Sequence, residues 1–338
     1  MSLLNKCTLA FEENRRLTAP FAGYPGLQIT GYDKLKAQSD HNAHYETIMS
    51  LFQRFSPDIV FPLMDLSMEV HALGKTGVFY QHTPYNEITA AIDAANLELL
   101  SQHTICDAPR IKENLKTLKL LTTDLGNKAL VCAYCSAPFT LAGQILGLDN
   151  IAVSLLIDPP FVHKLLEICT AKLEEYVEIL VKLGVDAICF LDPTAGLISP
   201  LQTDSFALQY LNRLIDICTL NDIDSIIHIC GNTTPILPLL MQTNASAISL
   251  DSPETGIILP QIAPLMPEDM ILMGNINPSG NILTAAQEDV ESEVAQLLTA
   301  MAKFPNFILS TGCDLPQSVP LANLKAFFSK KLSCSKIL

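Results

Sequence analysis

Three residues of the sequence are of the types that bind zinc. His228 and Cys230 are separated by one residue within the apolar run SIIHIC, and Cys313 follows the run FILSTG much later in the chain. Residues two apart in an extended strand project to the same side. Two thiolates and one imidazole suit Zn²⁺, and three protein ligands leave one coordination position open. His228, Cys230 and Cys313 are therefore our candidate metal ligands for a catalytic zinc site.

An open coordination position on zinc can activate a bound small molecule, for example a thiol. A free thiol has a pKa of about 8.5, so little of it is ionised at neutral pH. A bound cation stabilises the thiolate and lowers this pKa, while the sulfur keeps enough nucleophilicity to attack carbon. The open position is where the thiol substrate would bind.

Other polar residues flank the apolar runs. Asp192 and Asp251 directly follow the runs at 187–191 and 247–250, and they are our candidate catalytic residues. Asn275 and Asn277 follow the run at 270–273, and Asp58 opens the first run, which makes these three our candidates for cofactor binding. A simpler role is open for each, because Asp and Asn often cap helices and stabilise turns.

Two further pairs match metal motifs only in part. Cys132 and Cys135 form a CxxC at the end of an apolar run, where positions three apart point to opposite faces, so we expect both to be packing residues. His41 and His44 form an HxxH on a predicted polar helix without the glutamate of a metalloprotease motif. We expect them to be surface histidines.

The candidate residues require a scaffold of parallel strands. Continuous apolar runs rich in β-branched residues are typical of parallel strands buried on both faces. Helical segments separate many of them. Asp158 and two prolines open a predicted helix ending at Gly184, and Thr284 with Gln287 forms a predicted capping box. The predicted strands are 58–61, 129–133, 187–191, 225–230, 247–250, 270–273 and 307–310, with 78–80 a weaker candidate.

This alternation predicts an α/β fold, a (β/α)8 TIM barrel with an N-terminal helical extension. We expect one domain, with a helical cap over about residues 1–50 and the barrel over about 51–338. A doubly wound open sheet is the alternative, but no glycine-rich phosphate loop follows the first strand. Barrel enzymes place catalytic groups at the C-terminal ends of strands, where His228, Cys230 and Cys313 fall.

Composition limits the class of protein. The chain has 338 residues, of which 49% are hydrophobic, and a formal net charge of −14. Such a charge disfavours a nucleic-acid partner. We expect no membrane segment, because no apolar run reaches the length of a bilayer crossing, and a cytoplasmic location, because the N-terminus lacks the apolar stretch of a secretory signal. The ten cysteines are then expected to be mostly thiols.

Several stretches resemble the uroporphyrinogen decarboxylase superfamily, and more closely its corrinoid-dependent methyltransferase branch. They are HICGNTTPILPLL at 228–240, DPTAGLISP at 192–200, MGNINP at 273–278 and TGCDLPQSVPLANLKAF at 311–327. Decarboxylases of the superfamily carry an arginine-rich segment where this chain has TAPFAGYPG at 18–26, and a histidine motif where it has Gly312, Cys313 and Asp314. Acidic porphyrinogen side chains need cationic partners, so the missing arginines argue against decarboxylation.

The resemblance implies a zinc site made by His228, Cys230 and Cys313, with Asp251 as an exchangeable fourth ligand or a group that supports the ligands. It implies methyl transfer from a methylated corrinoid, free or carried by a small corrinoid protein, to a thiol such as coenzyme M. Three alternatives stay open: a tetrapyrrole decarboxylase, methyl transfer to a pterin, and a non-catalytic corrinoid- or metal-binding protein on the same fold.

Overall fold

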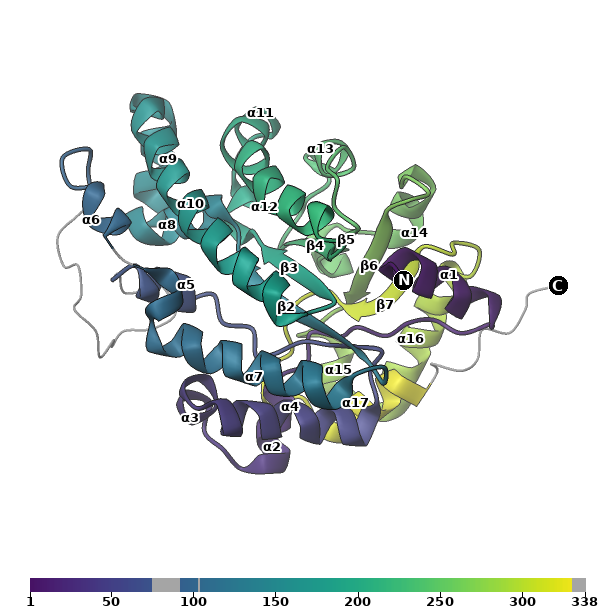
Figure 1. Ribbon diagram of the computed structural model, residues 1–338. Coiled ribbons are helices and arrows are strands. Elements are labelled where there is room, and N and C mark those ends of the chain that lie inside the picture. Colours follow the sequence, from purple (N-terminus) through teal and green to yellow (C-terminus); the bar gives the residue numbers. More distant parts are fainter. Residues whose placement is uncertain (75–91, 103, 330–338) are drawn as a thin grey trace.

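A computed structural model describes residues 1–74, 92–102 and 104–329, and Figure 1 shows its ribbon. Seven strands form one sheet in the order β1 to β7, and each strand pairs in parallel with the next one along the chain. The strands are β1 Ile59–Val60, β2 Leu130–Ser136, β3 Ala187–Leu191, β4 Asp224–Ile229, β5 Ala247–Leu250, β6 Ile271–Ile276 and β7 Phe307–Thr311. Because all seven are parallel, their C-terminal ends lie at one edge of the sheet.

The seven main strand predictions are confirmed, two of them with unchanged bounds. The weaker prediction at 78–80 lies outside the described residues. Within those residues the sheet therefore has one strand fewer than the predicted barrel. Strand β6 runs to Ile276 and so includes Asn275, which the prediction had placed beyond it.

The segment around Thr18 joins the two outer strands of the sheet. Thr18 forms a parallel bridge with Leu309 of β7, and its carbonyl accepts hydrogen bonds from the backbone of Asp58 and Ile59 at the start of β1. The N–H of Ala19 also donates to the Leu309 carbonyl. One short stretch of the N-terminal region thus satisfies backbone groups of both β1 and β7.

Helices surround the outer face of the sheet (Figure 1). Helix α10, Pro159–Leu183, confirms its prediction, since the Asp158 side chain accepts from the N–H of Phe161 and Gly184 ends the helix at a φ of 84°. The predicted capping box at Thr284 is wrong, because Thr284 ends the short helix α15, Asn281–Thr284, and its hydroxyl donates to the Gly280 carbonyl. The longer outer helices are α7 Pro109–Leu125, α8 Pro138–Leu146, α9 Leu148–Ile157, α10 Pro159–Leu183, α12 Gln209–Leu220, α16 Gln287–Ala300 and α17 Leu321–Ser329.

Helix α1, Leu3–Glu12, covers the N-terminal end of the sheet. The N–H of Leu3 donates to the carboxylate of Asp224, which begins β4, and the Cys7 thiol donates to the carbonyl of Phe307, which begins β7. Leu3, Cys7 and Ala10 are buried with the inward-facing side chains of the strands. The inner space is thus filled by side chains and closed at this end by α1.

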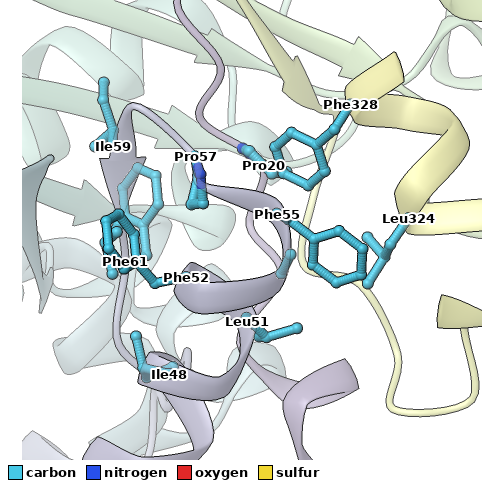
Figure 2. Close-up of a pocket in the computed structure, with 12 residues that line it drawn as sticks. Pro20, Ile48, Leu51, Phe52, Phe55, Pro57, Ile59, Phe61, Leu324 and Phe328 are labelled. Atoms are coloured by element: carbon cyan, nitrogen blue, oxygen red, sulfur yellow. The ribbon is translucent and has the colours of Figure 1, made fainter. Parts of the chain in front are cut away.

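Helix α4, His41–Phe55, packs beside α17, and the rings of Phe55 and Phe328 stack with centroids 5.5 Å apart. Figure 2 shows the apolar side chains that line a cavity of about 30 Å³ between these elements. This volume suits little more than a water molecule. The cavity belongs to the outer packing and has no room for a substrate.

The described part of the chain has no single helix that is both long and apolar enough to cross a membrane. Helices α8 and α9 are long and apolar enough only when taken together, and their axes are bent by 104° at Gly147.

Candidate metal centre

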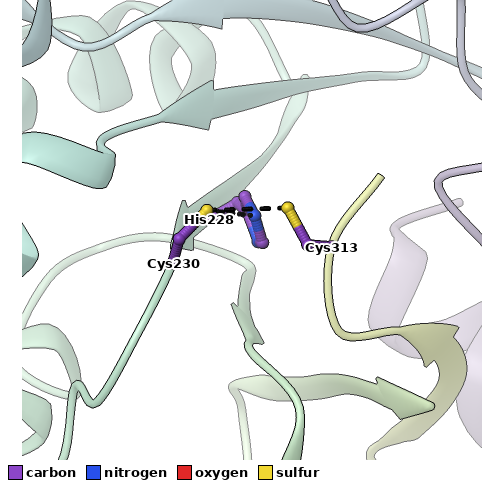
Figure 3. A group of neighbouring side chains, drawn as sticks. All are labelled: His228, Cys230 and Cys313. Atoms are coloured by element: carbon purple, nitrogen blue, oxygen red, sulfur yellow. Dashed lines mark hydrogen bonds between the residues drawn. The ribbon is translucent and has the colours of Figure 1, made fainter. Parts of the chain in front are cut away.

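His228, Cys230 and Cys313 converge at the C-terminal edge of the sheet. The Cys230 sulfur lies 3.4 Å from Nε2 of His228 and 3.6 Å from the Cys313 sulfur. All three ligand atoms lie within 4.8 Å of one another. Figure 3 shows the imidazole and the two sulfurs pointing toward one another. Cys230 follows β4 and Cys313 follows β7 in the chain. Their convergence is the arrangement that a tetrahedral metal site needs.

The alternation of β4 explains how His228 reaches the cluster. Ile226 lies in the inner core, while Ile227 and Ile229 lie in the outer core. His228 follows the inward series and is 1% exposed. The chain then leaves the sheet, and Cys230 reaches the same space from just beyond the strand. The side chains of His228 and Cys230, two positions apart, therefore point to the same side, as the sequence predicted.

Gly312 brings Cys313 to the cluster. A Cβ atom at position 312 would lie 2.5 Å from the backbone nitrogen of Ser252 and 2.9 Å from its Cα. The segment after β7 therefore runs closely along the segment after β5, and a larger residue would force the two segments apart. This contact sets the position of the third ligand.

The pKa values of the two thiols in the cluster are shifted in opposite directions. The hydrogen bond with Cys313, together with burial, raises the pKa of Cys230. The hydrogen bonds that the Cys313 sulfur accepts from Cys230 and His228 lower the pKa of Cys313. One sulfur of the pair is thus favoured as a thiolate, which is the form that binds a metal.

Asp251 lies beside the cluster but outside the group of converging ligand atoms. One carboxylate oxygen accepts from the N–H of Gly231 and the other from the N–H of Ser252, each at 2.6 Å. Gly231 follows Cys230, and Ser252 is the residue against which Gly312 packs. Asp251 therefore holds the backbone on both sides of the ligand set.

Asp192 is fully buried at the end of β3. One carboxylate oxygen accepts from the Thr140 hydroxyl at 2.7 Å, and the other has no hydrogen-bond partner among the described residues. Burial raises the pKa of Asp192 to about 7, although the bond from Thr140 opposes this. Its backbone N–H donates to the His228 carbonyl at 2.9 Å, so the residue abuts β4. No sequence motif marks Thr140 as its partner.

The three candidates for cofactor binding either lie away from the cluster or use their side chains in hydrogen bonds with other protein groups. Asn275 is 2% exposed and its side-chain nitrogen donates to the carbonyls of Asp251 and Ile257, so it links two segments instead of facing a ligand. The Asn277 side-chain oxygen accepts from the N–H of Ser279 in a turn. These contacts give both asparagines a structural role.

The predicted role of Asp58 in cofactor binding is corrected by its position. It precedes β1 and therefore lies at the N-terminal edge of the sheet, opposite the cluster. Its carboxylate accepts from the N–H and hydroxyl of Thr18 and pairs with Arg15 at 3.1 Å. The prediction failed because Asp58 starts a strand, whereas functional groups of parallel sheets gather where strands end.

The partial motifs have packing roles. Cys132 lies in the inner core and Cys135 in the outer core, as their spacing predicted. His41 is partly exposed and pairs with Glu113 at 2.6 Å. His44 is 5% exposed and its Nε2 accepts from the N–H of Leu63, so the expectation of a surface residue is wrong for it.

Sequence reasoning missed two buried polar groups at the C-terminal edge. Glu69 of α5, Met68–Ala72, accepts from the N–H and hydroxyl of Ser136 at the end of β2, and burial raises its pKa to about 7. The guanidinium of Arg110, at the start of α7, pairs with the carboxylate of Asp65. The segment FPLMDLSM that contains Asp65 looks apolar, and nothing in it signals this ion pair.

Comparison with known proteins identifies the family. The profile described as uroporphyrinogen decarboxylase (URO-D) matches residues 24–330. The chain belongs to the uroporphyrinogen decarboxylase family. The match includes all seven strands and the three converging residues, so the cluster is part of the family fold in this chain.

Relatives with two different names are similar to this chain. It is 32% identical over 237 residues to methylcobamide:CoM methyltransferase MtbA of Methanosarcina mazei, covering 68% of this chain and 65% of that relative. It is 30% identical over 224 residues to the protein of the same name from Methanosarcina acetivorans, covering 66% and 62%. The matched region thus spans less than two thirds of either relative.

A third relative matches over more of its length at lower identity. Uroporphyrinogen decarboxylase of Prochlorococcus marinus is 24% identical over 323 residues, covering 91% of this chain and 88% of that one. A solved structure described as a methyltransferase from Methanosarcina mazei superposes over 98% of both chains, with a TM-score of 0.79 and 18% identity. At this identity the superposition establishes the shared fold.

Proposed function

We propose that this chain is a zinc-dependent methyltransferase that moves a methyl group from a methylated corrinoid to a thiol such as coenzyme M. The observation that carries the proposal is the convergence of the ligand atoms of His228, Cys230 and Cys313 within 4.8 Å of one another. The two relatives named methylcobamide:CoM methyltransferase support the choice of donor and acceptor.

The residues of the cluster fit zinc by their chemistry. Two sulfurs and an imidazole nitrogen match its preference for soft and borderline ligands, and two thiolates balance the charge of a divalent cation. The pKa of Cys313 is already lowered by its neighbours, so part of the ligand set is prepared for binding. Zinc, when bound, would lower the pKa of a thiol at its open coordination position.

The protein residues then divide the remaining tasks. His228, Cys230 and Cys313 would hold the metal, and Asp251 would fix the backbone beside Cys230 and serve as an exchangeable ligand when no thiol is present. Asp192 is our candidate for accepting the thiol proton, because it follows β3 beside the His228 backbone and its pKa is raised to about 7.

The reaction balances as a nucleophilic substitution. The thiol loses its proton, and the sulfur forms a bond to the methyl carbon as the bond from that carbon to the cobalt of the corrinoid substrate breaks. The electron pair of the broken bond stays on cobalt, so the products are a methyl thioether and the reduced corrinoid. The corrin ring is wide and flat, and we propose that a small corrinoid protein presents it at the C-terminal edge of the sheet.

Decarboxylation of a tetrapyrrole is the second candidate, favoured by the long match to uroporphyrinogen decarboxylase. The placement of the arginines weighs against it. Arg16 donates to the carbonyls of Met301 and Phe304, and Arg110 is paired with Asp65. These contacts occupy cations that a substrate with several carboxylates would require.

We also propose that the fold is a (β/α)8-type barrel in which the segment around Thr18 takes the position between β7 and β1. Its hydrogen bonds to Leu309 on one side and to Asp58 and Ile59 on the other support this assignment.

The activity is tested by incubating the zinc-loaded protein with methylcobalamin and a panel of acceptors. Coenzyme M, other small thiols and tetrahydrofolate are compared, and loss of the cobalt–carbon absorbance is followed together with the methylated product. We expect turnover with a thiol. Turnover with tetrahydrofolate alone would assign a pterin acceptor, and carbon dioxide release from uroporphyrinogen without methyl transfer would overturn the proposal.

A further inference from the structure

A buried serine lies directly opposite the histidine of the cluster. His228 of β4 and Ser249 of β5 are partners in the parallel register, and neither is more than 1% exposed. Side chains at paired positions of neighbouring strands project to the same face. The Ser249 hydroxyl oxygen lies 3.1 Å from Nδ1 of His228, which is within hydrogen-bonding distance.

The two nitrogens of His228 therefore face different partners. Nε2 faces the Cys230 sulfur at 3.4 Å, and Nδ1 faces Ser249. A neutral imidazole binds a cation through the nitrogen that carries no proton. When Nε2 binds the metal, the proton lies on Nδ1 and is donated to the Ser249 oxygen. The serine thus favours the tautomer that metal binding at Nε2 requires.

A second contact restricts the ring from another side. Phe21 meets His228 edge-on, with ring centroids 4.9 Å apart and planes at 73°. Phe21 has no oxygen or nitrogen in its side chain, so among the described residues the hydrogen bond of Nδ1 is the one with Ser249. Without the hydroxyl, the buried Nδ1–H would lose its partner, which disfavours the tautomer that leaves Nε2 open.

We propose that Ser249 is a positioning residue that sets metal affinity by holding His228 with Nε2 directed at the two sulfurs. This inference rests on the proposed zinc site. It predicts that a residue which touches neither metal nor substrate controls how strongly the cluster binds zinc.

The experiment compares zinc affinity in four variants by competition with a chromophoric chelator. Ser249→Ala removes the hydroxyl. Ser249→Thr and Ser249→Val form a matched pair of similar volume in which only threonine keeps the hydroxyl, so they report on it even if the alanine variant does not fold. Ser225→Ala is the control, because Ser225 is a buried serine at the start of β4, on the face opposite to His228.

We expect Ser249→Ala and Ser249→Val to weaken zinc binding by about 10- to 100-fold, and Ser249→Thr and Ser225→Ala to stay close to wild type. Cobalt-substituted Ser249→Ala should also show shifted d–d absorption, which a general loss of stability does not produce. Equal affinity for threonine and valine variants overturns the inference while leaving the zinc site intact. Wild-type protein that binds no zinc overturns the proposed function, and the inference with it.

Discussion

The sulfur of Cys230 lies 3.6 Å from the sulfur of Cys313, although the two residues are 83 positions apart in the chain. Two half-buried thiols at this distance form a site that a divalent cation would stabilise. We expect the wild-type protein to hold about one equivalent of zinc, and Cys230→Ala and Cys313→Ala each to lose it, because two ligands from the protein are too few for a stable zinc site. Elemental analysis after dialysis measures this directly.

The matched control for these variants is Cys169→Ala. Cys169 is a fully buried thiol in α10, among the outer core residues. The Cys169→Ala variant should lose a similar number of buried side-chain atoms and still bind zinc. Zinc retained by both cluster variants, or lost from all three, would show that the metal is held elsewhere.

Gly312→Ala should separate the two segments that meet beside the cluster. The added Cβ would lie 2.5 Å from the Ser252 nitrogen, so the segment with Cys313 must shift. We expect zinc affinity to fall at least about tenfold, a size seen when groups supporting metal ligands are disturbed. Gly31→Ala is the control, since Gly31 has a φ of 75° with no atom within 4 Å and should lose about 1 kcal/mol of stability without losing zinc affinity.

Asp192→Asn should change how stability depends on pH. Burial raises the pKa of Asp192 to about 7 in the folded state, above the value of about 3.9 for an unfolded chain, so the folded state binds the extra proton between these values. Stability of the wild type therefore falls as pH rises through this window. Relative to Asp192→Asn, we expect the wild type to lose roughly 2–3 kcal/mol of unfolding free energy between about pH 5 and about pH 8.

Urea unfolding of the metal-free proteins at the two pH values provides the measurement. Asp204→Asn, at an exposed position, is the control and should show no such difference. If wild type and Asp192→Asn keep a constant stability difference across the range, Asp192 titrates normally. In that case Asp192 would not be the group that accepts the thiol proton in methyl transfer.

Asp58→Asn should lower stability without affecting the metal. The substitution replaces an oxygen that accepts from Thr18 or one that pairs with Arg15, at the edge of the sheet opposite the cluster. We expect a loss of about 1–3 kcal/mol in unfolding free energy, with zinc content and affinity unchanged. A variant with normal stability but impaired methyl transfer would return Asp58 to a role in ligand binding.

The sequence predicted those parts of the site that depend on strand periodicity alone. His228 and Cys230 lie two residues apart at the end of a strongly apolar strand, so their common direction followed from the pleat. Cys313 lies beyond the end of another such strand. The position of the strand ends could be predicted because short, continuous apolar runs such as 187–191 are typical of strands buried on both faces.

Features that depend on contacts between distant segments could not be predicted in this way. The hydroxyl of Ser249 is chemically ordinary, and only the register of β4 against β5 places it beside His228. Thr18 bonds with two strands although its own segment is too short to show a strand pattern. Asn275 was misassigned because β6 is longer than its apolar run, and the residue therefore lies inside the sheet.

Helix α1 closes the end of the sheet where the strands begin, through Leu3 on Asp224 and Cys7 on Phe307. In the described part of the chain, the reactants of the proposed transfer would therefore use an entrance at the opposite edge, where the cluster lies. A small thiol has to arrive before the broad corrin ring covers that entrance, and the thioether can depart only after the ring has withdrawn. Catalysis would then follow a compulsory order, with the methyl carrier as the last molecule to arrive and the first to leave.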